Sequence, residues 1–156
     1  MKAKTLHIKK GEIIQKNGDL NSKVYHVVSG LLRSYTIDEK GKEHIFMFAP
    51  ENWVIADNQS PETPCDLYID AIEDSEVVVL PKDIKREQSN AKAFIKRLGV
   101  LQKRVIMLMS HSAIDRYKHF IETYPDIVQR VPQKMIASYL GMTPEALSSI
   151  KRKSLQ

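Results

Sequence analysis

The periodicity of the apolar residues changes at Pro81, and this change is the strongest constraint on the fold. Before Pro81, short segments rich in β-branched and aromatic residues are separated by glycine, asparagine and proline. After Pro81, apolar residues recur at spacings of three and four, the period of an α-helix. Strands followed by helices along one chain are typical of the α+β class. The sequence therefore predicts an N-terminal antiparallel β-rich part and a C-terminal helical part.

Seven segments between residues 6 and 80 are predicted strands. They are LHIKK, EIIQK, KVYHVVSG, LLRSYTID, EHIFMFA, LYIDAIED and EVVVL. Asn17–Gly18 and Gly41 are turn signals because both suit a positive φ. Short strands at this close spacing favour a sandwich or barrel. No glycine-rich phosphate loop follows any of them, which argues against a P-loop or dinucleotide-binding fold.

An amphipathic helix is predicted over residues 83–111. Its apolar residues step alternately by four and three and form a heptad seam. The seam residues are Phe94, Leu98, Leu101, Val105 and Leu108. The helix either forms a coiled-coil dimer or packs on its own domain. We assign a second apolar flank to the same-chain core, so the seam itself is predicted to form the dimer interface; this flank consists of Ile95, Ile106 and Met109.

Residues 112–156 predict a small helical domain. Ser112 and an acidic residue three positions later resemble a capping box, which starts a helix that ends before Pro125. In the segment Val131–Arg152, Pro132 suits a helix start and Gly141 suits a helix end. Thr143 then suits the N-cap of a second helix. This arrangement is either a helix-turn-helix, whose second helix normally enters the DNA major groove, or an ordinary helical hairpin.

Charge is distributed unevenly along the 156 residues, whose net charge is +5. Residues 51–80 contain eight acidic residues and no lysine or arginine, whereas residues 81–156 contain fifteen basic and six acidic residues. A basic C-terminal half fits a nucleic-acid surface, although for residues 81–113 taken alone a solvated lysine-rich helix is the better explanation. No apolar run approaches the ~20 residues of a membrane span, and the N-terminus lacks the apolar core of a secretory signal. These features predict a cytoplasmic location.

The sequence offers no recognisable catalytic or metal-binding motif. Cys65 is the only cysteine, which excludes disulfide frameworks and multi-cysteine metal clusters within one chain, and its acidic surroundings predict an unreactive thiol. His111, Asp115 and His119 are spaced by four residues, but the predicted cap at Ser112 separates His111 from the other two. We therefore expect no enzymatic activity, no metal site and no cofactor.

In order, the chain contains a strand-rich module, a long amphipathic helix and a helix-turn-helix, and in this order it resembles the Crp/Fnr family of bacterial transcription regulators. The resemblance rests on KKGEIIQKNGDLNSKVYHVVSGLLRSY, ENWVIAD, AIEDSEVVVL, SAIDRY, YPDIVQRVP and PQKMIASYLGMTPEALSSI, with Gly11, Gly18, Gly30 and Gly41 at β-roll turns. It implies a cyclic-nucleotide-binding-like β-roll of jelly-roll type in residues 1–82. It further implies a dimerisation helix in 83–111, a DNA-binding domain in 112–156 and a homodimer on double-stranded DNA. Relatives usually carry an N-terminal helical segment, whereas this chain begins close to its first strand.

The segment that corresponds to the family's phosphate-binding cassette departs from the nucleotide-binding pattern. It reads WVIADNQSPETPCDLYIDA and contains no arginine, and Asp66 falls where the cyclic phosphate would be held. A carboxylate repels a phosphate, so we expect no binding of cyclic AMP or cyclic GMP. Trp53, Asp57, Asp66 and Tyr68 are candidates for binding a different small-molecule effector, with core packing as the alternative for the two aromatic residues.

The predicted recognition helix has few base-reading side chains. Thr143, Glu145, Ser148 and Ser149 are the groove candidates, and relatives tend to place an arginine at Ser149. Candidates for phosphate contacts are Gln133, Lys134, Lys151, Arg152 and Lys153. We therefore expect modest base specificity and strongly salt-dependent binding. The alternative is a sensor or interaction module that has lost sequence-specific DNA binding.

Overall fold

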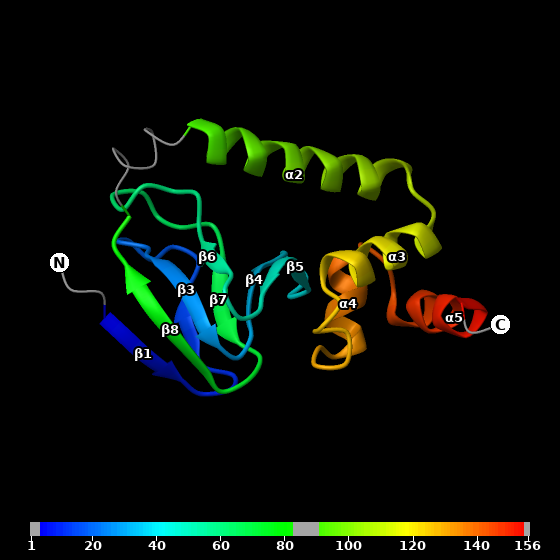
Figure 1. The fold of residues 1–156 in the computed structure, drawn as a ribbon, viewed down its shortest axis with the longest axis horizontal. Coiled ribbons are helices and arrows are strands. Elements are labelled where there is room, and N and C mark those ends of the chain that lie inside the picture. The colour runs from blue at the N-terminus through cyan, green and yellow to red at the C-terminus, as the bar shows by residue number, and fades with distance from the viewer. Residues whose placement is uncertain (1–3, 83–90, 155–156) are drawn as a thin grey trace. The chain divides into compact units, whose positions relative to one another are not determined.

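The computed structural model describes residues 4–82 and 91–154. It divides into two compact units, residues 1–84 and residues 85–156 (Figure 1). The described part of the first unit contains strands, and that of the second contains helices. The predicted α+β class is therefore confirmed.

The first unit contains two four-stranded antiparallel sheets. One has the order β1-β8-β3-β6, formed by Lys4–Ile8, Ser75–Leu80, Val24–Ser29 and Val54–Ala56. The other has the order β2-β7-β4-β5, formed by Ile13–Gln15, Tyr68–Ala71, Leu32–Ile37 and Glu43–Ala49. Seven strands overlap the seven predicted segments. Strand β6 is an addition to the predicted set and has three residues.

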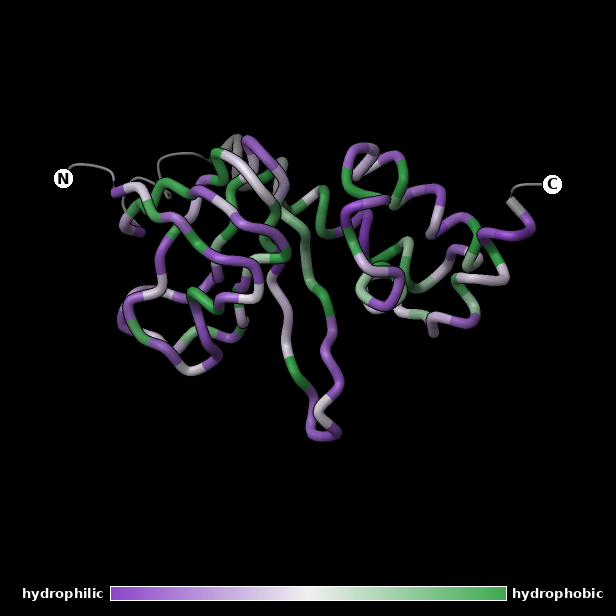
Figure 2. Tube along the Cα trace, turned by 90° about the horizontal axis from the view of Figure 1, so that it is seen from below, coloured by the Kyte–Doolittle hydropathy of each residue, from purple (hydrophilic) through white to green (hydrophobic). Residues whose placement is uncertain are grey.

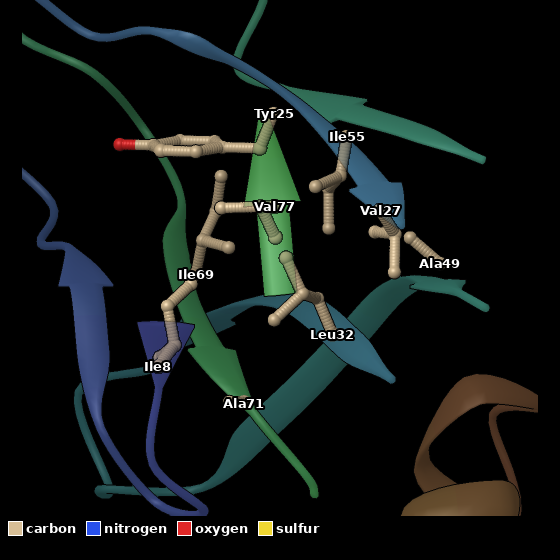
Figure 3. Close-up of a cluster of buried hydrophobic side chains, with 9 residues drawn as sticks. All are labelled: Ile8, Tyr25, Val27, Leu32, Ala49, Ile55, Ile69, Ala71 and Val77. Atoms are coloured by element: carbon tan, nitrogen blue, oxygen red, sulfur yellow. The ribbon is translucent and has the colours of Figure 1, made fainter. Parts of the chain in front are cut away.

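The core of this unit lies between the two sheets (Figure 3). Val27, Ile55 and Val77 project from the first sheet, and Leu32 and Ile69 project from the second. All five are fully buried. Successive residues of a strand point to opposite faces, so the alternate residues carry the core and their neighbours face outward. The architecture agrees with the predicted sandwich-like β-roll.

Gly30 makes the tight turn between β3 and β4 possible. Its φ is +87°, and a Cβ atom at this position would collide with Ser75 and with the carbonyl oxygen of Asp74. The Ser75 hydroxyl accepts a hydrogen bond from the backbone N–H of Leu31 at 3.1 Å. Glycine is therefore required here both for its left-handed backbone and for the close approach of β8.

The described helices of the second unit are α2, α3, α4 and α5. They span Ala91–Ser110, Ala113–Thr123, Gln133–Tyr139 and Pro144–Ser154. The predicted caps are present, because the Ser112 hydroxyl accepts from the Asp115 N–H at 3.3 Å and the Thr143 hydroxyl accepts from the Ala146 N–H at 3.2 Å. Pro132 lies at the N-cap of α4, one residue earlier than predicted. Within residues 4–82 and 91–154, no helix combines the length and apolarity needed to cross a membrane.

Aromatic rings form the centre of the second unit. Phe120 and Tyr124 of the α3 segment pack on Tyr139 of α4, with ring centroids 5.3–5.6 Å apart. Leu147 of α5 is also fully buried. These contacts attach the last two helices to α3 and give the C-terminal helices a common core.

The prediction that a second flank of α2 packs in the same-chain core is wrong. Ile95, Ile106 and Met109 are 67%, 48% and 81% exposed. Among the residues of α2 whose side chains the structure describes, Met107 is the buried one. The reason is that an apolar pattern identifies apolar positions without identifying the neighbour that covers each one.

The exposed apolar residues of α2 lie mainly along one side of the helix. We call this set the apolar stripe, and it consists of Ile95, Leu98, Val105, Ile106 and Met109, which are 48–81% exposed. Two residues of the predicted heptad seam, Leu98 and Val105, belong to it. Leu101 and Leu108 are half-buried, and the side chain of Phe94 lies outside the described residues. The stripe is therefore rotated around the helix relative to the predicted seam.

Candidate functional site

The turn between α4 and α5 is short and tightly hydrogen-bonded. Gly141 has φ of +63°, and its N–H donates to the Ser138 carbonyl at 3.2 Å. The Met142 N–H donates to the Ala137 carbonyl at 3.0 Å. Ala137 is fully buried, and its small side chain leaves room for the second helix to approach. These contacts build the predicted helix, glycine turn and helix.

One face of α5 is buried and the opposite face is exposed. Leu147 is fully buried, whereas Glu145 and Arg152 are exposed and Ser149 is half-buried. Glu145, Ser149 and Arg152 are spaced by four and three residues, so they lie along one side of the helix. An Arg152 guanidinium nitrogen lies 3.5 Å from the Ser149 hydroxyl. The outward face is thus formed by small and charged side chains that a groove could accept.

The remaining predicted DNA contacts occupy different positions. Gln133 and Lys134 are exposed in the first turn of α4, and Ser148 and Thr143 are exposed on and before α5. Lys151 is half-buried and follows Leu147 by four residues, so it lies on the inward side of α5. Among the basic residues at this end of α5, Arg152 and Lys153 are therefore the better placed for an external contact.

The basic end of α5 has a second effect. Lys151, Arg152 and Lys153 form the last turn, which gives the hydrophilic colour near the C-terminus in Figure 2, and Glu145 lies in the first turn. Cations at a helix C-terminus and anions at its N-terminus interact favourably with the helix dipole. This charge arrangement stabilises α5 and at the same time places positive charge at its far end.

In the β-roll, the loop between β6 and β7 is organised by Asp57. This carboxylate is 3% exposed. It accepts hydrogen bonds from the backbone N–H groups of Gln59 at 2.8 Å, Asp66 at 2.9 Å and Leu67 at 3.0 Å. Asp57, a predicted effector ligand, therefore uses its carboxylate to hold the loop.

Lys82, from outside the loop, also holds this loop in place, and sequence reasoning missed this contact. The Lys82 ammonium donates to the Gln59 carbonyl at 2.7 Å and to the Ser22 hydroxyl at 2.8 Å. The exposed Asp66 carboxylate accepts from the Gln59 side-chain amide at 2.6 Å. Lys82 comes from beyond the end of β8, so only the fold brings it to the loop. The loop therefore has a carboxylate at its surface, and the backbone N–H groups of Gln59, Asp66 and Leu67 are engaged by Asp57.

The two aromatic candidates have different surroundings. Trp53 packs against the hydrophobic core of the β-roll. Tyr68 stacks on Tyr35 with ring centroids 5.3 Å apart, on the face opposite to the core residue Ile69. The two aromatic candidates are therefore not brought together, whereas Asp57 and Asp66 lie in one loop and are joined by a hydrogen bond from the Asp66 N–H to the Asp57 carboxylate.

Arg33 forms an ion cluster on the outward face of the second sheet, which sequence reasoning also missed. Its guanidinium bonds Asp70 through Nε at 2.8 Å and Nη2 at 2.9 Å, and Glu43 through Nη1 at 2.6 Å. It also lies 4.2 Å from the Tyr35 ring centroid. The two carboxylates raise the pKa of Arg33, and burial, with the charge of Asp70 adding to it, raises the pKa of Tyr35 to about 12. The cluster joins β4, β5 and β7.

Cys65 is a buried residue of the β6–β7 loop. Its Sγ donates to the Lys16 carbonyl at 2.9 Å. Burial is the main cause that raises the pKa of the thiol, and the charge of Asp57 adds to it. The thiol therefore has little thiolate character at neutral pH, for a reason additional to the acidic surroundings on which the sequence prediction relied.

Comparison with known proteins places these features in a family. A family model described as a cyclic nucleotide-binding domain matches residues 5–89. The anaerobic regulatory protein of Haemophilus influenzae is 23% identical over 92% of this chain and 63% of its own length. The fumarate and nitrate reduction regulatory protein of Yersinia pestis is 28% identical over 92% of this chain and 65% of its own length. The chain thus spans somewhat less than two thirds of these relatives.

Solved structures share the fold over nearly the whole chain. FixK2 of Bradyrhizobium japonicum has a TM-score of 0.83 at 20% identity, covering 98% of this chain and 84% of that one. A CRP/FNR-family transcriptional regulator of Thermus thermophilus has a TM-score of 0.78 at 16% identity, covering 96% of this chain and 84% of that one. The chain belongs to the cyclic nucleotide-binding domain family, and its homologues and structural neighbours are Crp/Fnr-type regulators.

Proposed function

We propose that this chain is a homodimeric, DNA-binding transcription regulator of Crp/Fnr type that acts in the cytoplasm. The observation that carries the proposal is the exposed face of α5, which follows a glycine turn and a capping threonine. A helix presented in this way can enter the major groove. The sequence relatives, which are regulatory proteins, support this role rather than an enzymatic one.

The apolar stripe of α2 supports the homodimer. Its five side chains are 48–81% exposed on one helix, and a second copy of the same helix would cover them. Two paired chains would present two α5 helices to half-sites about one DNA turn (~34 Å) apart. The β-roll would then bind an effector other than cyclic AMP or cyclic GMP, because the Asp57 carboxylate occupies three backbone N–H groups of the β6–β7 loop.

The test is a salt titration of binding to a duplex selected from a random pool by the wild-type protein. Phosphate contacts release counterions, so the affinity should fall steeply with salt. Arg152→Ala should reduce the slope of log affinity against log salt by about two, since it removes one phosphate contact from each of the two protomers. Lys151→Ala is the matched control, because the half-buried Lys151 lies on the inward side of α5, and its slope should stay close to that of the wild type.

A wild-type protein that binds no duplex even at low salt would contradict the regulator assignment. Equal slopes for Arg152→Ala and the wild type would contradict the proposed role of Arg152. A larger slope change in Lys151→Ala than in Arg152→Ala would contradict the proposed orientation of α5.

A second candidate function is a sensor or interaction module without sequence-specific DNA binding. The outward face of α5 favours it, because Ser148 and Ser149 are small and Glu145 is acidic. A serine reads bases weakly, whereas arginine makes a bidentate contact to guanine. Competition of the selected duplex with a scrambled duplex separates the two functions. Equal competition by both duplexes supports the second candidate.

A further inference from the structure

Two arginines from the preceding helices meet the C-terminal end of α4. Arg104 of α2 lies with its guanidinium carbon 4.1 Å from the Tyr139 ring centroid, and its Nη2 is 3.5 Å from the Tyr139 carbonyl oxygen. Arg116 of α3 donates from Nη1 to the Leu140 carbonyl oxygen at 3.2 Å. Both arginines therefore contact the residues that lead directly into the turn between α4 and α5.

The two cations offset the partial negative charge at the C-terminal end of α4. The last carbonyl groups of a helix lack partners within the helix and carry partial negative charge. Helix α4 has seven residues and no basic residue in its last turn. The positive charge that compensates this end comes from α2 and α3.

Arg116 also contacts the end of α2. Its Nε donates to the His111 carbonyl oxygen at 3.2 Å, and His111 directly follows α2, which has no basic residue in its last turn either. One guanidinium thus joins the carbonyl groups at the ends of two helices. Leu108 of α2 also lies near this turn, because a Cβ atom built on Gly141 would lie 3.7 Å from its Cδ2.

Within one turn of α2, adjacent residues have different surroundings. Val105 and Ile106 belong to the exposed apolar stripe, whereas the adjacent Arg104 is half-buried against Tyr139. Consecutive residues are about 100° apart around a helix. A rotation of α2 that accompanies pairing of the stripe would therefore move Arg104, and through Tyr139 it would move the turn that orients α5.

We propose that Arg104 and Arg116 are positioning residues that transmit the orientation of α2 to the α4–α5 pair. In this role they set the separation of the two α5 helices in a dimer without contacting DNA themselves. The inference rests on the proposed function, since it concerns the regulation of the same DNA-binding face.

The experiment compares Arg104→Met and Arg116→Met with Lys103→Met, the matched control, in which an exposed cation next to Arg104 is removed. Each variant is titrated with three duplexes: the selected two-half-site duplex, the same duplex with half-site spacing increased by two base pairs, and a single half-site. The preference for the correct spacing should fall by roughly tenfold in the two arginine variants, within the usual range of coupling between sites. Half-site affinity should stay within about twofold of the wild type. Arg104→Lys should recover only part of the preference, because lysine keeps the charge and loses the planar stacking.

The outcomes separate a positioning role from a structural one. Equal weakening on all three duplexes, with a lower melting temperature, would assign the arginines to stability alone and overturn the proposal. An unchanged spacing preference would also overturn it. If the wild type binds no duplex, the proposed function fails, and a measurement without DNA then decides the inference. Spin labels at Ser148→Cys in the two protomers should give a narrow distance distribution in the wild-type background and a broad one in Arg104→Met, and equal widths refute the coupling.

Discussion

Replacing Leu98 with lysine should dissociate the proposed dimer. Leu98 belongs to the apolar stripe and is 56% exposed in the single chain. Full burial of a leucine side chain contributes about 1.5–3 kcal/mol, so covering roughly half of it contributes about 1–1.5 kcal/mol per protomer. Both protomers carry the substitution, which gives about 2–3 kcal/mol per dimer. The dissociation constant of the dimer should therefore rise by roughly 30- to 150-fold, as measured by sedimentation equilibrium over a concentration series.

Val100→Lys is the matched control for this prediction. Val100 is 60% exposed, as much as Leu98, but two residues along a helix correspond to a rotation of roughly 200°, which places it away from the stripe. The Val100→Lys protein should remain dimeric at concentrations at which Leu98→Lys is monomeric. If Leu98→Lys leaves the dimer unchanged, or if both variants dissociate alike, the stripe is not the interface.

Three further predictions concern the β-roll. Asp57→Asn loses one of three backbone hydrogen bonds and the charge that strengthens the others, so the free energy of unfolding in urea should fall by about 1.5–3 kcal/mol. The exposed control Asp66→Asn should lose less than about 0.5 kcal/mol. Equal losses in the two variants would contradict the role of Asp57. The pKa of Tyr35 is raised to about 12 in the folded protein. The stability that the protonated Tyr35 hydroxyl contributes is therefore fully present below the ordinary tyrosine pKa of ~10 and is lost as the pH rises through 12. When the pH is raised from ~10 to 12, the urea midpoint of Tyr35→Phe should fall less than the midpoint of the wild type. A parallel fall in both proteins would refute the assignment to Tyr35. Calorimetric titration with cyclic AMP should give no binding heat, and a micromolar binding curve would overturn the reading of the β6–β7 loop.

Several elements could be predicted because their signals are local. The caps at Ser112 and Thr143 and the turn at Gly141 each depend on residues within four positions along the chain. The strands of the β-roll were predicted from runs of β-branched and aromatic residues between turn signals, and β6 was the strand that this pattern missed. Local hydrogen bonding and backbone preference determine these features, so the sequence carries them without knowledge of the fold.

The parts of the candidate site that could not be predicted involve partners distant in sequence. Arg33 and Asp70 are 37 positions apart, and Arg104 and Tyr139 are 35 apart. Both arginines occur in segments whose secondary structure was predicted correctly, yet nothing local indicates which carboxylate or ring each one meets. The role of Asp57 could not be predicted either, because a carboxylate in a loop can bind a ligand or hold the loop together. The three backbone N–H groups that donate to Asp57, which only the fold brings together, assign it to holding the loop.

The sequence by itself determined the order of the seven predicted strands and of the helices, the caps and the turn before α5, because these depend on neighbouring residues and on the apolar period. The tertiary structure decided which side of α2 is exposed, which loop Lys82 reaches and which arginines meet the end of α4. The physical reason is that periodicity shows that a helix has an apolar side, whereas packing against neighbours far along the chain determines whether that side is covered. The helix predicted over residues 83–111 is present as Ala91–Ser110, and residues 83–90 lie outside the described residues. Its exposed apolar stripe of Ile95, Leu98, Val105, Ile106 and Met109 shares Leu98 and Val105 with the predicted seam.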